Sequence, residues 1–399
     1  MDLKSDLPFW PVKNGLLRCY PPLKSDEDCD VAILGGGITG ALVAHRLTQE
    51  GLSVVLVDRR EIAQGSTSAS TALLQYEVDT HLTDLAEMIG KDAAVRAYRL
   101  CSNAIDQLAE IVSGLDDACD FERQPSLYLA SQPQDIPALQ TECELRARHD
   151  FPVRWRSTLD IRNEFGFEAQ GGILSQQAAA VDPFRLTHRL LEAGLNRGLR
   201  VYDRTTVLAW KSTGTGVELT TDRDAIIRAK VMVFANGYEA QTALREKIVT
   251  LKSTYALITA PDQPQVWKQP CLIWESARPY LYLRRTAEGR ILAGGEDDPF
   301  RSPARRDAQL DLKKNRLLER LKSLFPDFPL ESEYAWAGTF GETKDGLAYI
   351  GPSPEITNAH FALGFGGNGI TYSVIAAEIL SDLIQGRPNE DAHLFRFGR

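Results

Sequence analysis

The chain has 399 residues, of which 43% are hydrophobic and 25% charged, and its formal net charge is -9. This length and composition predict two or three globular domains with a sizeable core. The acidic balance disfavours a nucleic-acid-binding protein, because such proteins present a basic face. No run of about 18 apolar residues occurs, so no membrane-spanning helix is expected.

Residues 1–28 are rich in proline and aromatic residues, and we expect them to lie on the surface without helix or strand. A short apolar run then predicts a buried strand over 30–34. Near-helical spacing predicts a helix over 38–50, ended by Gly51. A second buried strand is expected over 54–57. Strand, turn, helix and strand in this order begin a doubly wound parallel sheet.

Two kinds of pattern alternate along the rest of the chain. Apolar residues three and four positions apart predict helices, and alternating or β-rich stretches predict strands. The helices are expected at 82–113, 184–196, 311–324 and 370–384. The strands are expected at 126–130, 153–155, 201–220, 226–235, 252–260, 271–275, 279–286, 290–295 and 361–364.

Elements typical of nucleotide-binding folds recur in three separate parts of the chain, with sheet-rich blocks between them. We therefore expect an α/β fold with a discontinuous, Rossmann-like cofactor domain and a second α+β domain built on an antiparallel sheet. After an arm at 1–28, the cofactor domain is expected at 29–115, 181–250 and 335–399, and the second domain at 116–180 and 251–334.

The six cysteines and six histidines are scattered along the chain. None of them forms a C-x-x-C pair or a metal-ligand spacing, so we expect reduced thiols and no metal site. The first residues contain no basic segment followed by an apolar run, and no secretory signal is expected. These features predict a cytoplasmic protein.

A glycine motif follows the first predicted strand and begins the first predicted helix. Gly35 permits the tight turn, Gly37 lets the backbone approach a pyrophosphate, and Gly40 lets helix and strand pack closely. The N–H groups at the helix N-terminus attract phosphates. Asp58, which ends the second strand, can accept hydrogen bonds from a ribose and would repel a 2′-phosphate. Together these residues predict a dinucleotide other than NADP.

The segment 65–71, Gly-Ser-Thr-Ser-Ala-Ser-Thr, bears on which dinucleotide is bound. In an NAD enzyme the chain usually enters another helical crossover at this point. A loop of small hydroxyl residues is suited to the second phosphate and ribityl chain of FAD. An ordinary polar loop is the alternative.

Four motifs occur in an order typical of one flavoprotein family. They are 30–40 with Asp58, then 65–74, then Val181-Asp182-Pro183 with 231–237, and finally 345–351 with 364–371. Over residues 28–385 this pattern resembles the D-amino-acid oxidase superfamily of FAD-dependent oxidoreductases. Glycine oxidase, sarcosine oxidase and γ-glutamylputrescine oxidoreductase are members of that family.

The resemblance implies how FAD is held. The backbone at Val207 would lie against the adenine, and the 364–371 turn would direct a helix N-terminus at the pyrimidine end of the flavin ring. The implied FAD-binding residues are Gly35, Gly36, Gly37, Ile38, Thr39, Gly40, Asp58, Arg59, Gly65, Ser66, Thr67, Ser68, Thr71, Leu73, Leu74, Val207, Ala235, Gly237, Gly338, Gly366, Gly367, Asn368, Gly369, Ile370 and Thr371.

Relatives with covalent flavin carry a cysteine or a histidine at positions that match 336–340 or 65–70. Neither stretch contains one here, so the expected FAD is non-covalent. The resemblance also implies oxidation of the C–N bond of an amine or amino acid by hydride transfer to the flavin, followed by hydrolysis of the imine.

Two departures from the family pattern leave the substrate and the electron acceptor open. Leu292 stands where sarcosine oxidase has a lysine that promotes reaction with oxygen, so either O2 or another acceptor fits. Gly367 and Thr371 stand where relatives have a basic residue that holds the substrate carboxylate. A small α-amino acid therefore lacks one expected anchor.

Other polar residues are candidates for the substrate site. Arg284, or its neighbour Arg285, could bind a carboxylate bidentately, and Lys344 precedes a turn expected near the flavin. Glu77, with nearby aromatic residues, would suit a cationic amine. These aromatic residues are Tyr76, Trp274 and Tyr255. We name Arg284, Lys344, Glu77 and Thr371 as catalytic candidates; ordinary surface or packing roles are the alternatives.

Two other functions also fit the sequence. The first is a flavoprotein dehydrogenase that oxidises a 2-hydroxy acid, and the second is a flavin-binding subunit that is active only with a partner. For the leading function, the expected partners are a small-molecule amine or amino-acid substrate and O2 or another electron acceptor, with no nucleic acid and no membrane span.

Overall fold

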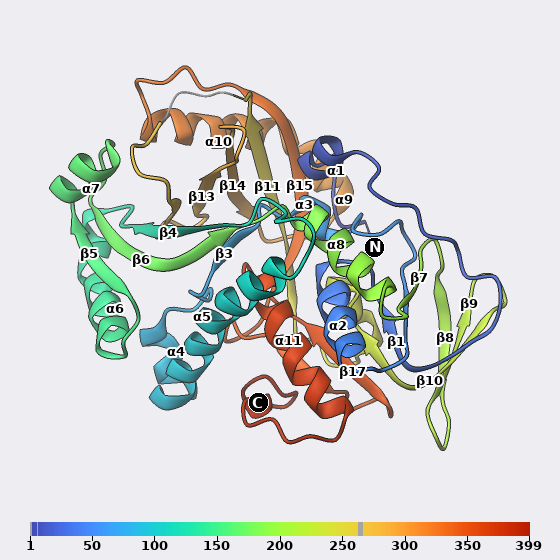
Figure 1. Ribbon diagram of the computed structural model, residues 1–399. Helices are drawn as coiled ribbons and strands as arrows, with labels where there is room; N and C mark the ends of the chain where they lie inside the picture. Colours follow the sequence, from blue (N-terminus) through green and yellow to red (C-terminus); the bar gives the residue numbers. More distant parts are fainter. Residues whose placement is uncertain (1, 6, 262–265) are drawn as a thin grey trace.

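Two β-sheets with helices around them form the structure, a computed structural model that describes residues 2–5, 7–261 and 266–399 (Figure 1). Residues 1 and 6 of the expected arm, and 262–265 of the expected second domain, lie outside the described residues. The helices are α1 (Phe9–Asn14), α2 (Ile38–Gln49), α3 (Ser66–Ala69), α4 (Leu82–Ile89), α5 (Lys91–Ser113), α6 (Ile136–Arg148), α7 (Thr158–Phe165), α8 (Pro183–Leu195), α9 (Pro303–Ala308), α10 (Leu310–Leu324) and α11 (Gly369–Ile384).

The first sheet has eight strands and a parallel centre. Five neighbouring strands, β17, β10, β1, β2 and β7, run parallel, while β16 and the β8–β9 hairpin pair antiparallel at the margins. The strands are β1 (Glu27–Leu34), β2 (Val54–Val57), β7 (Arg200–Tyr202), β8 (Val207–Ser212), β9 (Val217–Thr221), β10 (Ile226–Phe234), β16 (Tyr349–Pro352) and β17 (Ala359–Leu363). Helices α8, α2 and α11 pack in succession beside this sheet.

The second sheet has nine strands, and all but one of its pairings are antiparallel. The exception is the parallel pair of β4 and β12, which joins two parts of the chain that are far apart in sequence. The strands are β3 (Leu73–Gln75), β4 (Glu122–Leu129), β5 (Val153–Ser157), β6 (Gly171–Ala180), β11 (Thr250–Thr259), β12 (Leu272–Glu275), β13 (Leu281–Arg285), β14 (Ile291–Asp298) and β15 (Ser332–Glu342). Helix α10 packs against β11, β14 and β15.

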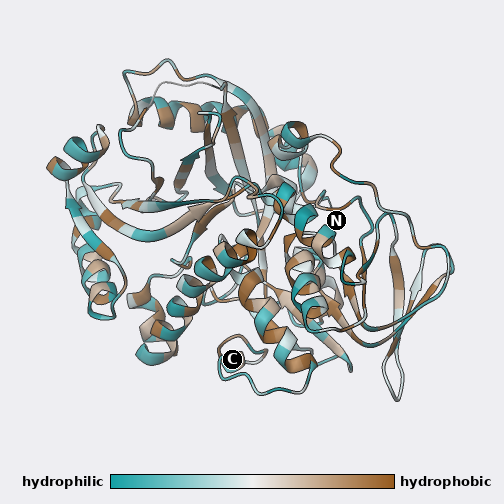
Figure 2. Ribbon diagram, in the orientation of Figure 1, coloured by the Kyte–Doolittle hydropathy of each residue, from teal (hydrophilic) through white to brown (hydrophobic). Residues whose placement is uncertain are grey.

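This architecture confirms the expected α/β fold with a Rossmann-like part and an antiparallel sheet. The sequence explains the difference between the layers. Helix α11, packed inside the molecule, is mostly apolar, whereas α6 and α7 at the rim carry polar outer faces (Figure 2). A helix surrounded by protein can be apolar on several sides, but a rim helix needs only one apolar stripe.

Some sequence expectations were wrong in detail. The helix expected over 82–113 is two helices, because Gly90 between α4 and α5 has a positive φ of 88° that no helix accommodates. Strands β6 and β15 and helices α6 and α7 were not expected. The alternation in the two strands is weak, and β15 pairs with β11, a strand that is distant in sequence.

The N-terminal arm is the largest correction. It was expected on the surface without helix or strand, but it contains α1 and its residue Trp10 is only 1% exposed. The indole of Trp10 donates a hydrogen bond to the carbonyl of Ser70 at 2.6 Å, and Ser5 N–H bonds the carbonyl of Ala337 at 3.0 Å. Burial of the large aromatic side chains, each contributing about 1.5–3 kcal/mol, draws the arm into the fold.

Candidate functional site

A cavity of about 590 Å³ lies where the two sheets meet. Its lining includes the last residues of four parallel strands, namely Leu34, Val57, Phe234 and Leu363. In open α/β sheets ligands bind at the carboxyl ends of the strands, because the helix N-termini gather there. Strands β11, β12, β13 and β15 of the nine-stranded sheet close the opposite side.

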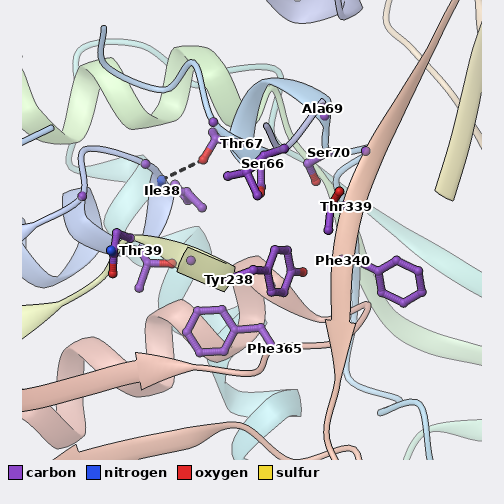
Figure 3. A pocket seen from close by; sticks show the side chains of 18 of the residues that line it. Ile38, Thr39, Ser66, Thr67, Ala69, Ser70, Tyr238, Thr339, Phe340 and Phe365 are labelled. Atoms are coloured by element: carbon purple, nitrogen blue, oxygen red, sulfur yellow. Dashed lines mark hydrogen bonds between the residues drawn. The ribbon is translucent and has the colours of Figure 1, made fainter. Parts of the chain in front are cut away.

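One end of the cavity is formed by the glycine turn between β1 and α2. Gly35 has a φ of 119°, and a Cβ added there would lie 2.5 Å from the carbonyl oxygen of Ala235. At the start of α2, Ile38 N–H donates to the hydroxyl of Thr67 at 3.0 Å (Figure 3). This bond joins the glycine turn to α3, the expected second FAD contact. Position 35 requires glycine, because the backbone of Ala235 lies too close for any side chain there.

Asp58 stabilises the same turn. Its carboxylate accepts hydrogen bonds from the N–H groups of Gly36 and Arg60, both at 2.7 Å. Burial raises the pKa of Asp58 above its ordinary value, while the two N–H groups act in the opposite direction. Next to it, Arg60 forms an ion pair with Glu239 at 2.9 Å. The carboxylate thus lines the cavity and also holds the turn in place.

The polar groups at this end fit the phosphates and ribose of a dinucleotide. The hydroxyl of Ser66 and the side-chain oxygen of Asn236 are buried and have no hydrogen-bond partner among the described residues. Buried polar groups are nearly always satisfied in the complete protein. In Figure 3 the hydroxyl residues of α3 and Ser70 face the same space as Tyr238 and Thr339. With the N-terminus of α2, these groups form a set of donors and acceptors suited to FAD, with donors for the phosphates and acceptors for the ribose hydroxyls.

The other end of the cavity is formed by the turn that precedes α11. The amide of Asn368 donates to the carbonyls of Gln75 and Glu77 at 3.0 and 2.8 Å, and the hydroxyl of Thr371 donates to Gln75 at 3.2 Å. These bonds fix the loop that follows β3 against the helix. The N-terminus of α11 therefore has a defined position relative to this loop.

Asp79 lies on that loop and lines the cavity, although the sequence reasoning did not select it. Its carboxylate accepts the N–H of Gly367 at 3.1 Å. A Cβ added at Gly366, whose φ is 54°, would lie 2.1 Å from the carboxylate, so glycine is needed there. Burial raises the pKa of Asp79. No lysine or arginine among the described residues forms an ion pair with it.

Aromatic side chains cover this end of the cavity. Trp274 stacks on Tyr128 with ring centroids 3.7 Å apart, and Tyr280 and Tyr282 lie 5.5 Å apart. Arg278 is exposed, and its guanidinium lies 5.0 Å from the ring centroid of Tyr280. All of these residues except Tyr128 line the cavity. Phe340 and Phe365 add further rings to the lining (Figure 3).

Most of the FAD-binding residues expected from the sequence come together in this cavity. The exceptions are Gly36, Gly40, Ser68, Leu74 and Thr371, which lie behind the lining. Leu292, the position linked to oxygen reactivity, is fully buried in β14 and also outside the lining.

Two catalytic candidates lie away from the cavity. Arg284 is buried, donates to the carbonyl of Val181 at 2.9 Å, and lies 5.2 Å from the ring centroid of Trp10. Burial lowers the pKa of Arg284 to about 10. Lys344 is exposed and donates to the carbonyl of Arg399.

Glu77 lines the cavity but is already engaged. Arg146 lies 3.3 Å from Glu77 and 2.7 Å from Glu142, and all three side chains are at most 1% exposed. Burial raises the pKa of Glu77. The pKa of Glu142 is lowered despite its burial, because the Arg146 charge and two N–H groups of α4 outweigh the desolvation. Glu142 therefore differs from Glu77 both in its shorter distance to Arg146 and in the two N–H groups that donate to it.

Of the three aromatic residues named as candidates with Glu77, only one lines the cavity. Trp274 lines the cavity, whereas Tyr76 stacks on Phe151 at 5.3 Å and Tyr255 donates to Asp298 at 2.9 Å. Glu77 and Asp79 are two positions apart in the loop after β3, so local sequence alone gave little reason to choose between them. The signal available was the presence of two acids in that loop.

This fold, with FAD-suited groups at the strand ends, defines a nucleotide-cofactor oxidoreductase. The FAD dependent oxidoreductase family matches residues 30–383, and the chain belongs to this family. It is an FAD-dependent enzyme. Of the residues that the structure describes, none lies in a helix long and apolar enough to cross a membrane.

Named relatives span nearly the whole chain. A putative Rieske 2Fe-2S iron-sulfur protein of Bacillus subtilis is 25% identical, covering 97% of this chain and 74% of the relative. The γ-glutamylputrescine oxidoreductase of Escherichia coli is 23% identical, covering 92% and 86%. The crystal structure of glycine oxidase from Geobacillus kaustophilus matches with a TM-score of 0.77 and 22% identity, covering 94% and 99%.

Proposed function

We propose that this enzyme oxidises the C–N bond of an amine or amino acid. The observation that carries the proposal is the aromatic end of the cavity around Trp274, Tyr280 and Tyr282, which adjoins the FAD-suited end. The names of the relatives, a glycine oxidase and a γ-glutamylputrescine oxidoreductase among them, support an amine or amino-acid substrate.

The chemistry needs few protein groups. Bound FAD supplies an acceptor for a hydride, that is, for one hydrogen nucleus and two electrons. In the substrate the C–H bond breaks and its electron pair leaves with the hydrogen as hydride, while the nitrogen lone pair forms the C=N bond. Water then converts the imine to a carbonyl compound and ammonia or an amine. The aromatic residues bind and orient the substrate and exclude water from its reacting carbon.

We further propose a division of labour between the two sheets. The eight-stranded sheet, with α2 and α11, would hold FAD through the residues named above, and the nine-stranded sheet would provide the substrate side. Bonds from Asn368 and Thr371 to the β3 loop support this arrangement, because they join the two parts. Among the described lining residues there is no cysteine or histidine, which supports non-covalent FAD.

The electron acceptor in our proposal is a molecule other than oxygen. The described residues that line the cavity include no lysine, and of the arginines only Arg278 lies at the substrate end. The relative named as a putative Rieske protein supports an iron–sulfur protein as the acceptor. Reduced enzyme mixed with oxygen should reoxidise slowly, whereas a one-electron dye should oxidise it quickly.

Anaerobic titration with amines, amino acids and 2-hydroxy acids tests the function. We expect the visible absorbance of the flavin to bleach with at least one amine or amino acid, and ammonia or an amine to appear with the carbonyl product. Bleaching by hydroxy acids alone would contradict the proposal. Acid precipitation should leave the yellow colour in the supernatant; colour in the pellet would contradict non-covalent binding.

A further inference from the structure

Asp79 is a carboxylate in the cavity that forms no ion pair with any described lysine or arginine. The Asp79 carboxylate accepts a hydrogen bond from Gly367 N–H. No nitrogen of a described lysine or arginine lies within 4.0 Å of it as an ion-pair partner. A half-buried carboxylate loses part of its hydration, and only a cation or further donors compensate for that loss. The free carboxylate therefore favours a positively charged ligand.

The charges around Asp79 strengthen this preference. Asp297 lies nearby, its Oδ1 has no partner among the described residues, and burial raises its pKa to about 6. Lys252 is neutralised by Glu342 at 2.5 Å. Arg278 is the remaining cation, and it lies on the exposed rim. The ionised carboxylates of Asp79 and Asp297 make the inner surroundings negative, which opposes a substrate carboxylate beside the reacting carbon.

The hydroxyl group of Tyr280 lies near the same carboxylate. A Cβ placed on Gly367 would be 3.0 Å from Asp79 Oδ1 and 3.8 Å from the hydroxyl of Tyr280, so both groups reach the same small region. A carboxylate and a phenol oxygen can both accept hydrogen bonds from one ammonium group. The loop that carries Asp79 is held by Asn368 on one side and by the Arg146 pair with Glu77 on the other.

We propose that Asp79 binds a second, cationic nitrogen of the substrate, which therefore carries two basic nitrogens and no carboxylate beside its reacting carbon. The inference rests on the proposed function, because it assumes oxidation of a C–N bond. Hydride leaves a carbon only when the adjacent nitrogen has a free lone pair to form the C=N bond. A nitrogen paired with Asp79 keeps its proton, so it is not the reacting nitrogen.

Wild-type enzyme with FAD bound provides the first test. Anaerobic flavin reduction is followed with α,ω-diamines of three to six carbons and with n-alkylamines of equal length. We expect the rate of reduction at low substrate concentration to favour the best diamine by about 10- to 100-fold, the range of a charge-assisted hydrogen bond. Equal rates for diamines and monoamines would overturn the inference and leave the proposed function intact.

Asp79→Asn provides the second test, with Asp84→Asn as its matched control. Asp84 is an exposed carboxylate five residues further on, at the start of α4. Asp79→Asn should reduce the diamine-to-monoamine ratio at least tenfold, mainly through substrate affinity, and Asp84→Asn should leave it unchanged. An equal loss in the rate of flavin reduction with diamines and with monoamines would overturn the inference. Asp79 would then act on the reacting nitrogen or on folding. The wild-type series decides the question if the variant does not fold.

Tetramethylammonium has no nitrogen lone pair, so it can bind as a cation but cannot lose hydride. Its binding therefore tests the cation site separately from the proposed function. Its binding is measured from the change in flavin absorbance. Wild-type enzyme should bind it at least tenfold more tightly than Asp79→Asn. If no amine reduces the flavin but this difference appears, the proposed function fails and the cation site stands. Equal binding by both proteins counts against the cation site.

Discussion

The two ends of the cavity are constructed from different parts of the protein. Near Gly35 and Ala235 the walls are largely backbone, with helix N-termini and hydroxyl groups, whereas near Asp79 and Trp274 they are largely side chains. In our proposal, the backbone wall binds the phosphates of FAD, the cofactor that members of the family share. A wall of side chains can change without disturbing the fold. If the proposed division holds, substitutions can alter substrate recognition at one end and leave FAD binding at the other end intact.

The largest effect is expected from Arg146→Met, which breaks the support of the substrate end. Removing the arginine leaves Glu77 and Glu142 buried without a cation, so the free energy of unfolding should fall by about 3–5 kcal/mol. Urea denaturation measures this change. The control is Arg148→Met on the same helix, whose exposed pair with Glu144 should contribute about 0.3–0.5 kcal/mol. Equal losses in both variants would show that the buried pair does not support the loop.

The next effect concerns the backbone wall. Gly35→Ala should weaken FAD binding at least about tenfold, because the added Cβ meets the Ala235 carbonyl and the positive φ is strained by about 1–3 kcal/mol. FAD fluorescence titration gives the affinity. Gly51→Ala is the control. Gly51 also has a positive φ, 81°, but a Cβ there would meet open space, so this variant should lose stability and keep its FAD affinity. Unchanged affinity in Gly35→Ala would remove the contrast between the two ends.

A smaller effect is expected from pH at the substrate end. Because burial raises the pKa of Asp79, its charge is complete at higher pH and is lost as the pH falls through that raised value. Tetramethylammonium affinity should therefore decline on acidification beginning above pH ~4, the ordinary range of an aspartate. Asp79→Asn should flatten this decline. Neighbouring groups that share the field are Asp297, Glu342, Lys252, Arg278 and Tyr280.

Lys344→Ala should have the smallest effect. The side chain is exposed, bonds a backbone carbonyl near the C-terminus and lies outside the cavity. We expect a change of at most about 0.5 kcal/mol in the free energy of unfolding and an unaltered rate of flavin reduction. A large fall in the rate of flavin reduction would show that Lys344 takes part in the reaction although it lies outside the cavity lining.

The Rossmann-like beginning of the chain, the family and the FAD cofactor follow from the sequence alone. The sequence suffices for them because the residues near Gly35 and Gly366 act through local backbone conformation, which adjacent residues dictate. The periodic helices α2, α8, α10 and α11 were expected for the same reason, since a helix is formed from neighbours in sequence.

The tertiary structure decided which side chains face the cavity. Glu77 and Asp79 look alike in the sequence, but Arg146, from a helix more than sixty residues away, pairs with the first and leaves the second free. Similarly, Trp10 of the arm covers Arg284 and removes it from the substrate side. Burial and charge pairing depend on contacts between distant segments, and no local pattern encodes them.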